Sequence, residues 1–168
     1  MLKSSPYILQ FSGLKLGNHS FEFLLEASFF DSCESFGIQK GSGIAKAELE
    51  KKETMMLLSL TLNATLDVLC DRCNENMSLD VNGHMELIYK FGTEESLDES
   101  LVILPPDSYQ IDMFQPVYEL LVVSLPTRFI HPNDGCDPEV LRFLNTPPPS
   151  QEKKIEIDPR WSALNKLN

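Results

Sequence analysis

The middle of the chain alternates hydrophobic and polar residues over three long stretches. These are residues 38–53, 54–69 and 77–91, and in each of them the apolar residues mostly share one parity. Side chains of a strand point alternately to its two faces, so a period of two predicts three strands with one buried face each. The short connections between them predict an antiparallel meander, because parallel neighbours need long crossovers.

The first of these stretches has a helical alternative. Ala and Glu residues favour a helix over residues 45–52. Gly41 and Gly43 weaken the start of such a helix, and the next stretch needs a pairing partner, so we favour the strand.

Shorter elements flank the meander. Residues 7–11 and 21–25 are interpreted as two strands joined by a turn that contains Gly and Asn, and residues 26–36 as a short helix or an irregular link. Residues 101–104 form a short apolar strand that two prolines end.

A buried helix is predicted between Asp112 and Pro126. Asp112 and Gln115 have the spacing of a capping box at its start. Its apolar stripe consists of Met113, Val117, Leu120 and Leu121, followed by Ser124. A stripe of this kind favours packing of the helix against the sheet.

These elements predict the fold class α+β, with an antiparallel, strongly bent β-sheet, one buried helix and an extended C-terminal tail. We expect a single domain over residues 1–145, in which residues 138–145 form a last helical turn. A proline-led tail over residues 146–168 follows, because Pro147 to Pro149 make a stiff spacer.

The chain is acidic, with 14 Lys and Arg against 25 Asp and Glu, a formal charge of −11. This balance argues against a protein that coats nucleic acid, and it suits a basic protein partner. Residues 91–127 contain seven acidic residues and neither Lys nor Arg. A solvated face is the simpler explanation of that run, and a docking surface is the other.

The sequence predicts a cytoplasmic protein with no membrane contact. The chain contains no apolar run of roughly 20 residues, and its start lacks the pattern of a signal peptide.

Cys70 and Cys73 carry the strongest chemical signal. They stand as Cys-x-x-Cys in the predicted connection between two strands, and this spacing lets both sulfur atoms face one point. The same spacing serves a redox dithiol, but such motifs usually open a helix, so we rank a metal above redox chemistry. A cytosolic disulfide is not expected.

His131 and Cys136 are the candidates for the other two ligands of a tetrahedral zinc site. They lie on a loop rich in Pro and Gly after the predicted helix, and Asp134 is a weaker oxygen alternative. The simpler interpretation is that the thiols are small packing residues and that His131 is an ordinary loop histidine. Cys33 stands apart and is interpreted as a core or turn residue.

Arg72, Arg128, Arg160 and Trp161 are the candidates for contact with RNA or a partner. Arginine beside an exposed aromatic ring stacks on bases or holds phosphate. Charge balance in an acidic protein is the simpler explanation, and we favour it for the tail alone. No phosphate loop, nucleophile elbow or zinc-protease motif is present, and no small-molecule substrate is inferred.

The order of these features resembles the YceD-like family of large ribosomal RNA subunit accumulation proteins. The resemblance runs from about Gly13 to Leu167. It rests on these residues: Cys70, Arg72 and Cys73 after a leucine-rich strand, then Leu125, Pro126, His131 and Cys136, and finally Asp158-Pro159-Arg160-Trp161, Leu164 and Leu167.

The resemblance implies a bacterial cytosolic or plastid factor for accumulation of large-subunit (23S) ribosomal RNA, with an assembly or processing role and no established catalysis. We therefore expect a non-enzymatic ribosome-biogenesis factor that contacts the large-subunit rRNA precursor or basic ribosomal proteins. The alternative is a thiol–disulfide or metal-dependent enzyme centred on Cys70 and Cys73. A third hypothesis is an interaction adaptor with no link to ribosomes.

Overall fold

The computed structural model describes residues 7–93, 97–98, 100–132 and 135–145. The elements in chain order are β1 (Ile8–Gln10), β2 (Gly17–Leu25), α1 (Ala27–Phe30), the 3-10 helix η1 (Asp31–Phe36), β3 (Ile38–Lys51), β4 (Met55–Leu69), β5 (Asn76–Phe91), β6 (Leu101–Leu104), β7 (Gln110–Asp112), α2 (Phe114–Ser124) and α3 (Pro138–Asn145). The predicted mixed α+β class is confirmed, with strands dominating.

The chain divides into two compact units, Met1–Cys136 and Asp137–Asn168. In the second unit, α3 confirms the predicted helical turn. The boundary expected after residue 145 stays a prediction, since residues 146–168 lie outside the described residues.

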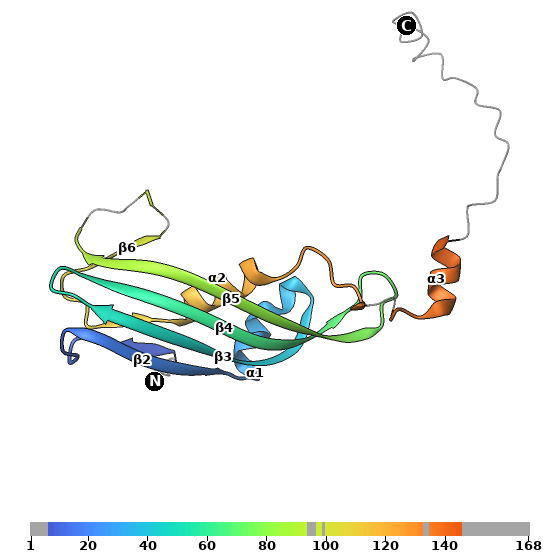
Figure 1. Ribbon diagram of the computed structural model, residues 1–168, viewed down its shortest axis with the longest axis horizontal. Helices are drawn as coiled ribbons and strands as arrows, with labels where there is room; N and C mark the ends of the chain where they lie inside the picture. The colour runs from blue at the N-terminus through green and yellow to red at the C-terminus, as the bar shows by residue number, and fades with distance from the viewer. Residues whose placement is uncertain (1–6, 94–96, 99, 133–134, 146–168) are drawn as a thin grey trace, which may run out of the picture. The chain divides into compact units, whose positions relative to one another are not determined.

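The first unit is built on a five-stranded sheet with the order β2-β3-β4-β5-β6. β3, β4 and β5 pair antiparallel along their whole lengths, which confirms the predicted meander (Figure 1). In the middle of the sheet Leu60 lies opposite Ala47 on one side and Met85 on the other. The alternation also sets the two faces: the residues of β4 that share the parity of Leu60 are buried, from Met56 to Val68.

The sheet is not purely antiparallel, and that part of the prediction is wrong. β6 lies parallel to β5, with Leu101 beside Ile88 and Leu104 beside Phe91. The connection from β5 to a parallel neighbour needs no helix here because β6 is short. The chain has to run back over the length of only four residues, roughly 13 Å, and the link before β6 is long enough to do so. The strong bend expected of the sheet stays a prediction.

The two strands predicted over residues 7–11 and 21–25 are present as β1 and β2, but they do not pair with each other. β1 pairs antiparallel with β7 in a separate two-stranded sheet, with Leu9 opposite Ile111. Tyr7 shows the reason, because its ring packs edge-on against Phe29 at 5.6 Å and its carbonyl accepts the N–H of Met113 at 2.7 Å. Burial of this aromatic end draws the N-terminal strand towards the start of α2 rather than towards β2.

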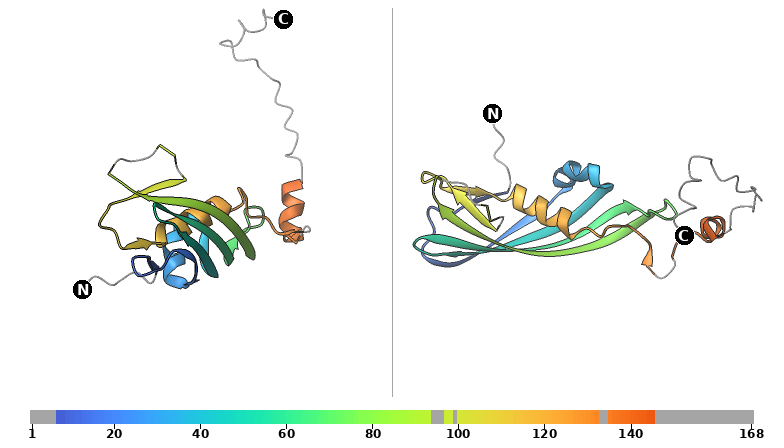
Figure 2. Two further views of the ribbon diagram at one scale, coloured as in Figure 1. Left: turned by 60° about the vertical axis from the view of Figure 1, so that its left-hand side comes forward. Right: turned by 90° about the horizontal axis from the view of Figure 1, so that it is seen from above.

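Two helices cover the same face of the five-stranded sheet, as Figure 2 shows. α2 buries Val117, Leu120 and Leu121, so the predicted packing of a helix on the sheet is confirmed. α1 adds Phe29 and Phe30 to this layer, so the expectation of one buried helix is incomplete.

The start of α2 departs from the expected capping box. The Asp112 carboxylate accepts the N–H of Phe114 at 2.9 Å, as a cap does. Gln115 does not complete the box, because its side-chain amide donates to Glu119 at 2.6 Å, one turn further along the helix.

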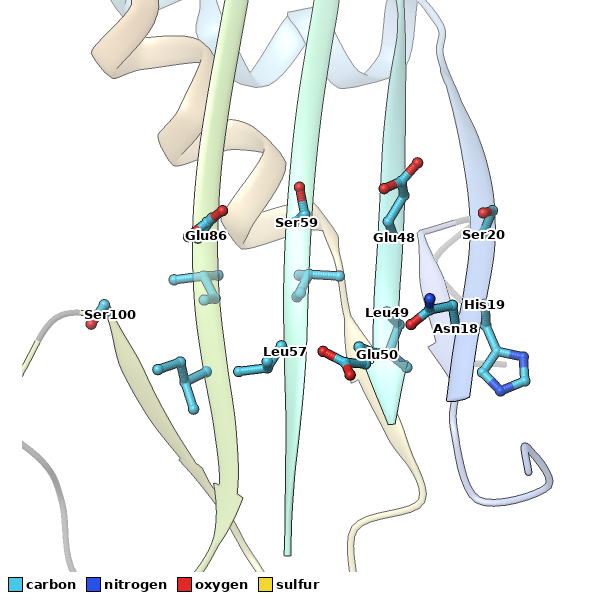
Figure 3. Close-up of a pocket in the computed structure, with 13 residues that line it drawn as sticks. Asn18, His19, Ser20, Glu48, Leu49, Glu50, Leu57, Ser59, Glu86 and Ser100 are labelled. Atoms are coloured by element: carbon cyan, nitrogen blue, oxygen red, sulfur yellow. The ribbon is translucent and has the colours of Figure 1, made fainter. Parts of the chain in front are cut away.

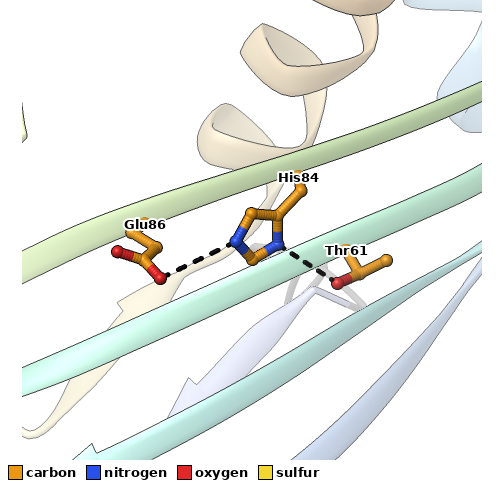
Figure 4. A network of polar contacts seen from close by, with 3 residues as sticks. All are labelled: Thr61, His84 and Glu86. Carbon is orange, nitrogen blue, oxygen red and sulfur yellow. Dashed lines mark hydrogen bonds and ion pairs between the residues drawn. The ribbon is translucent and has the colours of Figure 1, made fainter.

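The opposite face of the sheet is polar and open to solvent. There the His84 ring lies 3.5 Å from the Thr61 hydroxyl and 3.7 Å from the Glu86 carboxylate (Figure 4). All three are exposed or half-exposed, so contacts of this kind contribute little to stability. The sheet therefore has one face that holds the core and one face available to other molecules.

Candidate metal centre

The turn between β4 and β5 holds the first two cysteines. The N–H of Cys70 donates to the Glu75 carbonyl at 2.9 Å, and the N–H of Asn74 donates to the Cys70 carbonyl at 2.8 Å. Asn74 takes a positive φ of 59°, a conformation that asparagine tolerates better than most residues. This tight turn brings the side chains of Cys70 and Cys73 to the same side of the chain, beside His131 and Cys136.

The segment after α2 supplies the other two residues. Two hydrogen bonds fasten it to the turn: the N–H of Asp71 donates to the Phe129 carbonyl at 2.7 Å, and the N–H of Phe129 donates to the Asp71 carboxylate at 2.8 Å. Sequence reasoning missed this role of Asp71, although an aspartate between two cysteines in a turn is a recognisable capping residue.

Cys70, Cys73, His131 and Cys136 come together in one cluster. Their ligand atoms all lie within 4.8 Å of one another. The Cys70 and Cys136 sulfur atoms are 3.7 Å apart, and the Nδ1 atom of His131 lies 3.4 Å from the Cys73 sulfur. The three cysteines are buried and the histidine is half-buried.

The distances between the Cys70 and Cys136 sulfur atoms and between Cys73 and His131 match the edges of a metal-centred tetrahedron. With a zinc–sulfur bond of about 2.3 Å, two sulfur ligands stand about 3.8 Å apart, and a sulfur and a nitrogen ligand slightly less. The distance from His131 Nδ1 to the Cys136 sulfur, 3.7 Å, also fits. The backbone N–H of Arg72 points at the Cys70 sulfur, 3.4 Å away, which is the donor that a metal-bound thiolate accepts. The cluster is therefore able to hold a metal ion.

The thiols of this cluster have opposed acidities. Burial raises the pKa of the Cys70 thiol, but backbone N–H groups of Cys73, Arg72 and His131 outweigh it and lower that pKa to about 6. Burial and the two other thiols raise the pKa of Cys136 to about 11. Negative charge on the Cys70 sulfur therefore opposes ionisation of the Cys136 thiol. A cation bound between the sulfur atoms removes this repulsion.

The other predicted contact residues fall into two groups. Arg72 is half-buried between the two cysteines, and Arg128 is exposed beside Phe129, so both flank the cluster. Arg160 and Trp161 lie outside the described residues, as does Asp134.

A second surface feature lies on the open face of the sheet. It is a hollow of about 630 Å³ whose rim includes the carboxylates of Glu48, Glu50 and Glu86, with Leu57 at its floor (Figure 3). None of the residues that line it is Lys or Arg. It lies about 33 Å from the metal cluster along β4, counted from Ser59 to Leu69 at roughly 3.3 Å per residue.

The comparison with known families identifies a family whose model overlaps the segments that carry the cluster. The model of the family described as "Large ribosomal RNA subunit accumulation protein YceD" matches residues 58–168. This match covers most of the chain and includes all four residues of the cluster.

The chain belongs to the YceD family. The family name implies a role in the accumulation of large-subunit ribosomal RNA. The match starts at residue 58, within β4, so β1, β2 and β3 precede it, whereas the resemblance was expected to begin near Gly13. Comparisons with curated proteins and with solved structures gave no match.

Within the part of the chain that the structure describes, no helix is both long and apolar enough to cross a membrane.

Proposed function

We propose that this YceD-family protein is a non-enzymatic, cytoplasmic ribosome-biogenesis factor that supports accumulation or maturation of 23S rRNA. In this proposal Cys70, Cys73, His131 and Cys136 hold a structural zinc ion. The supporting observation is the meeting of four ligand atoms within 4.8 Å, although two segments far apart in the sequence contribute them. The ion links the turn between β4 and β5 to the segment that follows α2.

The ligand set supports a structural ion. Four protein ligands fill a tetrahedral site and leave no position for a water molecule or a substrate, which a catalytic zinc requires. Three soft thiolates and an imidazole select zinc over magnesium or calcium, which prefer oxygen.

The charge distribution supports a basic protein as the main partner. Carboxylates line the hollow on the open face, and these repel the phosphates of RNA. Basic ribosomal proteins have the complementary charge. Local RNA contact is then left to Arg72 and Arg128 beside the metal centre, and to Arg160 and Trp161 of the tail.

Depletion of the protein tests the ribosomal role. In cells that lack it, the amount of mature 23S rRNA and the number of free large subunits are expected to fall, while small subunits are maintained. The measurement is sedimentation of ribosomal particles on a gradient, with quantification of 23S and 16S rRNA. An unchanged ratio of the two rRNAs in depleted cells contradicts the proposal, and re-expression of the wild-type protein is the control for secondary effects.

The low pKa of Cys70 is the one observation that favours the runner-up, a thiol–disulfide enzyme. However, Cys70 is only 1% exposed, and the same N–H donors that lower its pKa suit a metal-bound thiolate. We expect Cys70 to resist alkylation by iodoacetamide at pH 7 in the native protein and to react after zinc is removed with a chelator. Rapid labelling of Cys70 in the zinc-loaded protein supports the enzyme instead.

A further inference from the structure

β5 presents a long unpaired edge. It pairs with β4 along its whole length, but β6 covers only Ile88–Phe91 on its other side. Among the described residues no strand lies beside the remainder, Asn76–Leu87. Figure 1 shows β6 at one end of β5 and this open length beyond it.

The direction of the backbone groups on this edge follows from the pairing with β6. The N–H of Ile88 donates away from β4, to the Ser100 carbonyl at 2.7 Å. Backbone groups alternate in direction along a strand, so those of every second residue before Ile88 also point outward. The residues concerned are Ser78, Asp80, Asn82, His84 and Glu86, and the side chains of all five are exposed. The edge therefore offers a row of donors and acceptors to another strand.

The end of α2 packs on the strand that carries this edge. A Cβ atom on Gly83 would meet Ser124 and would lie 2.9 Å from Leu120, so the end of α2 sits directly on β5. Val123 follows Leu120 by three residues, and its side chain is 83% exposed. An added strand would cover this side chain with one of its faces.

Charge favours one class of occupant. Neither residues 76–89 nor α2 contain Lys or Arg. Asp80 and Glu86 lie on the open face of β5, where the Asp80 carboxylate accepts a hydrogen bond from the Thr65 hydroxyl of β4 at 2.8 Å. On the helix side, burial and, after it, the negative charge of Glu119 on α2 raise the pKa of the Tyr89 phenol to about 12. A second copy of this chain added at the same edge would set these acidic residues against one another, which is unfavourable.

We propose that the free edge of β5 binds an extended, lysine- or arginine-bearing segment of a partner protein as an added strand. Its cationic side chains would lie over Asp80 and Glu86 on the open face, and its alternate apolar side chains would pack against Val123 on the helix side. The inference takes the basic partner from the proposed function and adds the place where that partner binds, the free edge of β5.

The test uses a nine-residue peptide of alternating lysine and valine as the probe. It is expected to bind the full chain and to protect the backbone amides of residues 78–86 from hydrogen exchange. The same peptide with N-methylated amides on its bonding edge is expected not to bind, because it lacks the ladder donors. A version with glutamate in place of lysine is expected to bind at least about tenfold more weakly.

A matched pair of variants separates the edge from general acidity. Glu86→Lys is expected to weaken binding of the lysine peptide by about tenfold. Glu53→Lys makes the same change of charge at an exposed residue between β3 and β4, outside the hollow, and is expected to weaken binding by less than about twofold at physiological salt. Titration calorimetry measures both, and circular dichroism verifies that both variants fold.

Three results overturn the inference. The first is that the N-methylated peptide binds as well as the unmodified one. The second is that protection from hydrogen exchange appears at β2 rather than at β5. The third is that sedimentation shows the free protein to be a dimer in which residues 78–86 are protected. None of these affects the rRNA role, and an unchanged rRNA ratio after depletion leaves the peptide result intact, so the two proposals fail separately.

Discussion

Replacing Cys136 with serine is expected to empty the proposed zinc site and to destabilise one end of the sheet. A serine hydroxyl is a poor zinc ligand, so zinc affinity should fall by more than about 100-fold. Loss of the ion releases the segment after α2 from the turn that contains Cys70 and Cys73. We expect the free energy of unfolding to fall by about 3 kcal/mol, and Tm by roughly 6–12 °C for a chain of this size.

The measurements are zinc content per chain by atomic emission and thermal unfolding followed by circular dichroism. Cys33→Ala is the matched control, because Cys33 is also fully buried but does not belong to the cluster. It should keep the zinc content of the wild type and lose only about 1 kcal/mol. A Cys136→Ser protein that retains its zinc, or a wild-type protein purified without zinc under non-chelating conditions, contradicts the metal proposal.

Leu60→Ala is expected to destabilise the protein far more than Leu57→Ala, although both remove a leucine from the same strand. Leu60 is fully buried in the layer that α2 covers, so its removal leaves a cavity and costs about 2–5 kcal/mol. Leu57 is half-exposed on the open face, at the floor of the hollow, and its removal should cost less than about 1 kcal/mol. Urea unfolding at equilibrium gives both values.

Equal losses for the two leucines would mean that something covers the open face as well. In that case the hollow beside Glu48 and Glu86 is not a free surface, and the charge argument for a basic partner loses its basis. The slope of the unfolding curve serves as the control, because an unchanged slope shows that both variants unfold from the same folded state.

Local patterns predicted the meander well because they depend only on neighbouring residues. Alternation along β4 assigns Leu60 to the core whatever the partner strands are. The spacing of Cys70 and Cys73 similarly predicts that two sulfur atoms face one point, and the structure brings both into one cluster.

Pairing between distant segments was harder to predict. The amphipathic pattern of β1 indicates a strand, but it does not identify β7 as its partner, and four apolar residues in β6 do not indicate a parallel direction. Contacts such as that of the Tyr7 ring with Phe29 decide these pairings, and they join residues that no local pattern relates.

The sequence by itself determined the strands of the meander, the buried face of α2, the acidic charge and the candidate ligands, since periodicity and residue chemistry are properties of the chain alone. Only the tertiary structure decided that His131 and Cys136 meet Cys70 and Cys73, and that β6 leaves most of one edge of β5 uncovered. The physical reason is that both depend on where segments far apart in the chain come to lie. Packing of the whole core sets those positions, and no single segment specifies them.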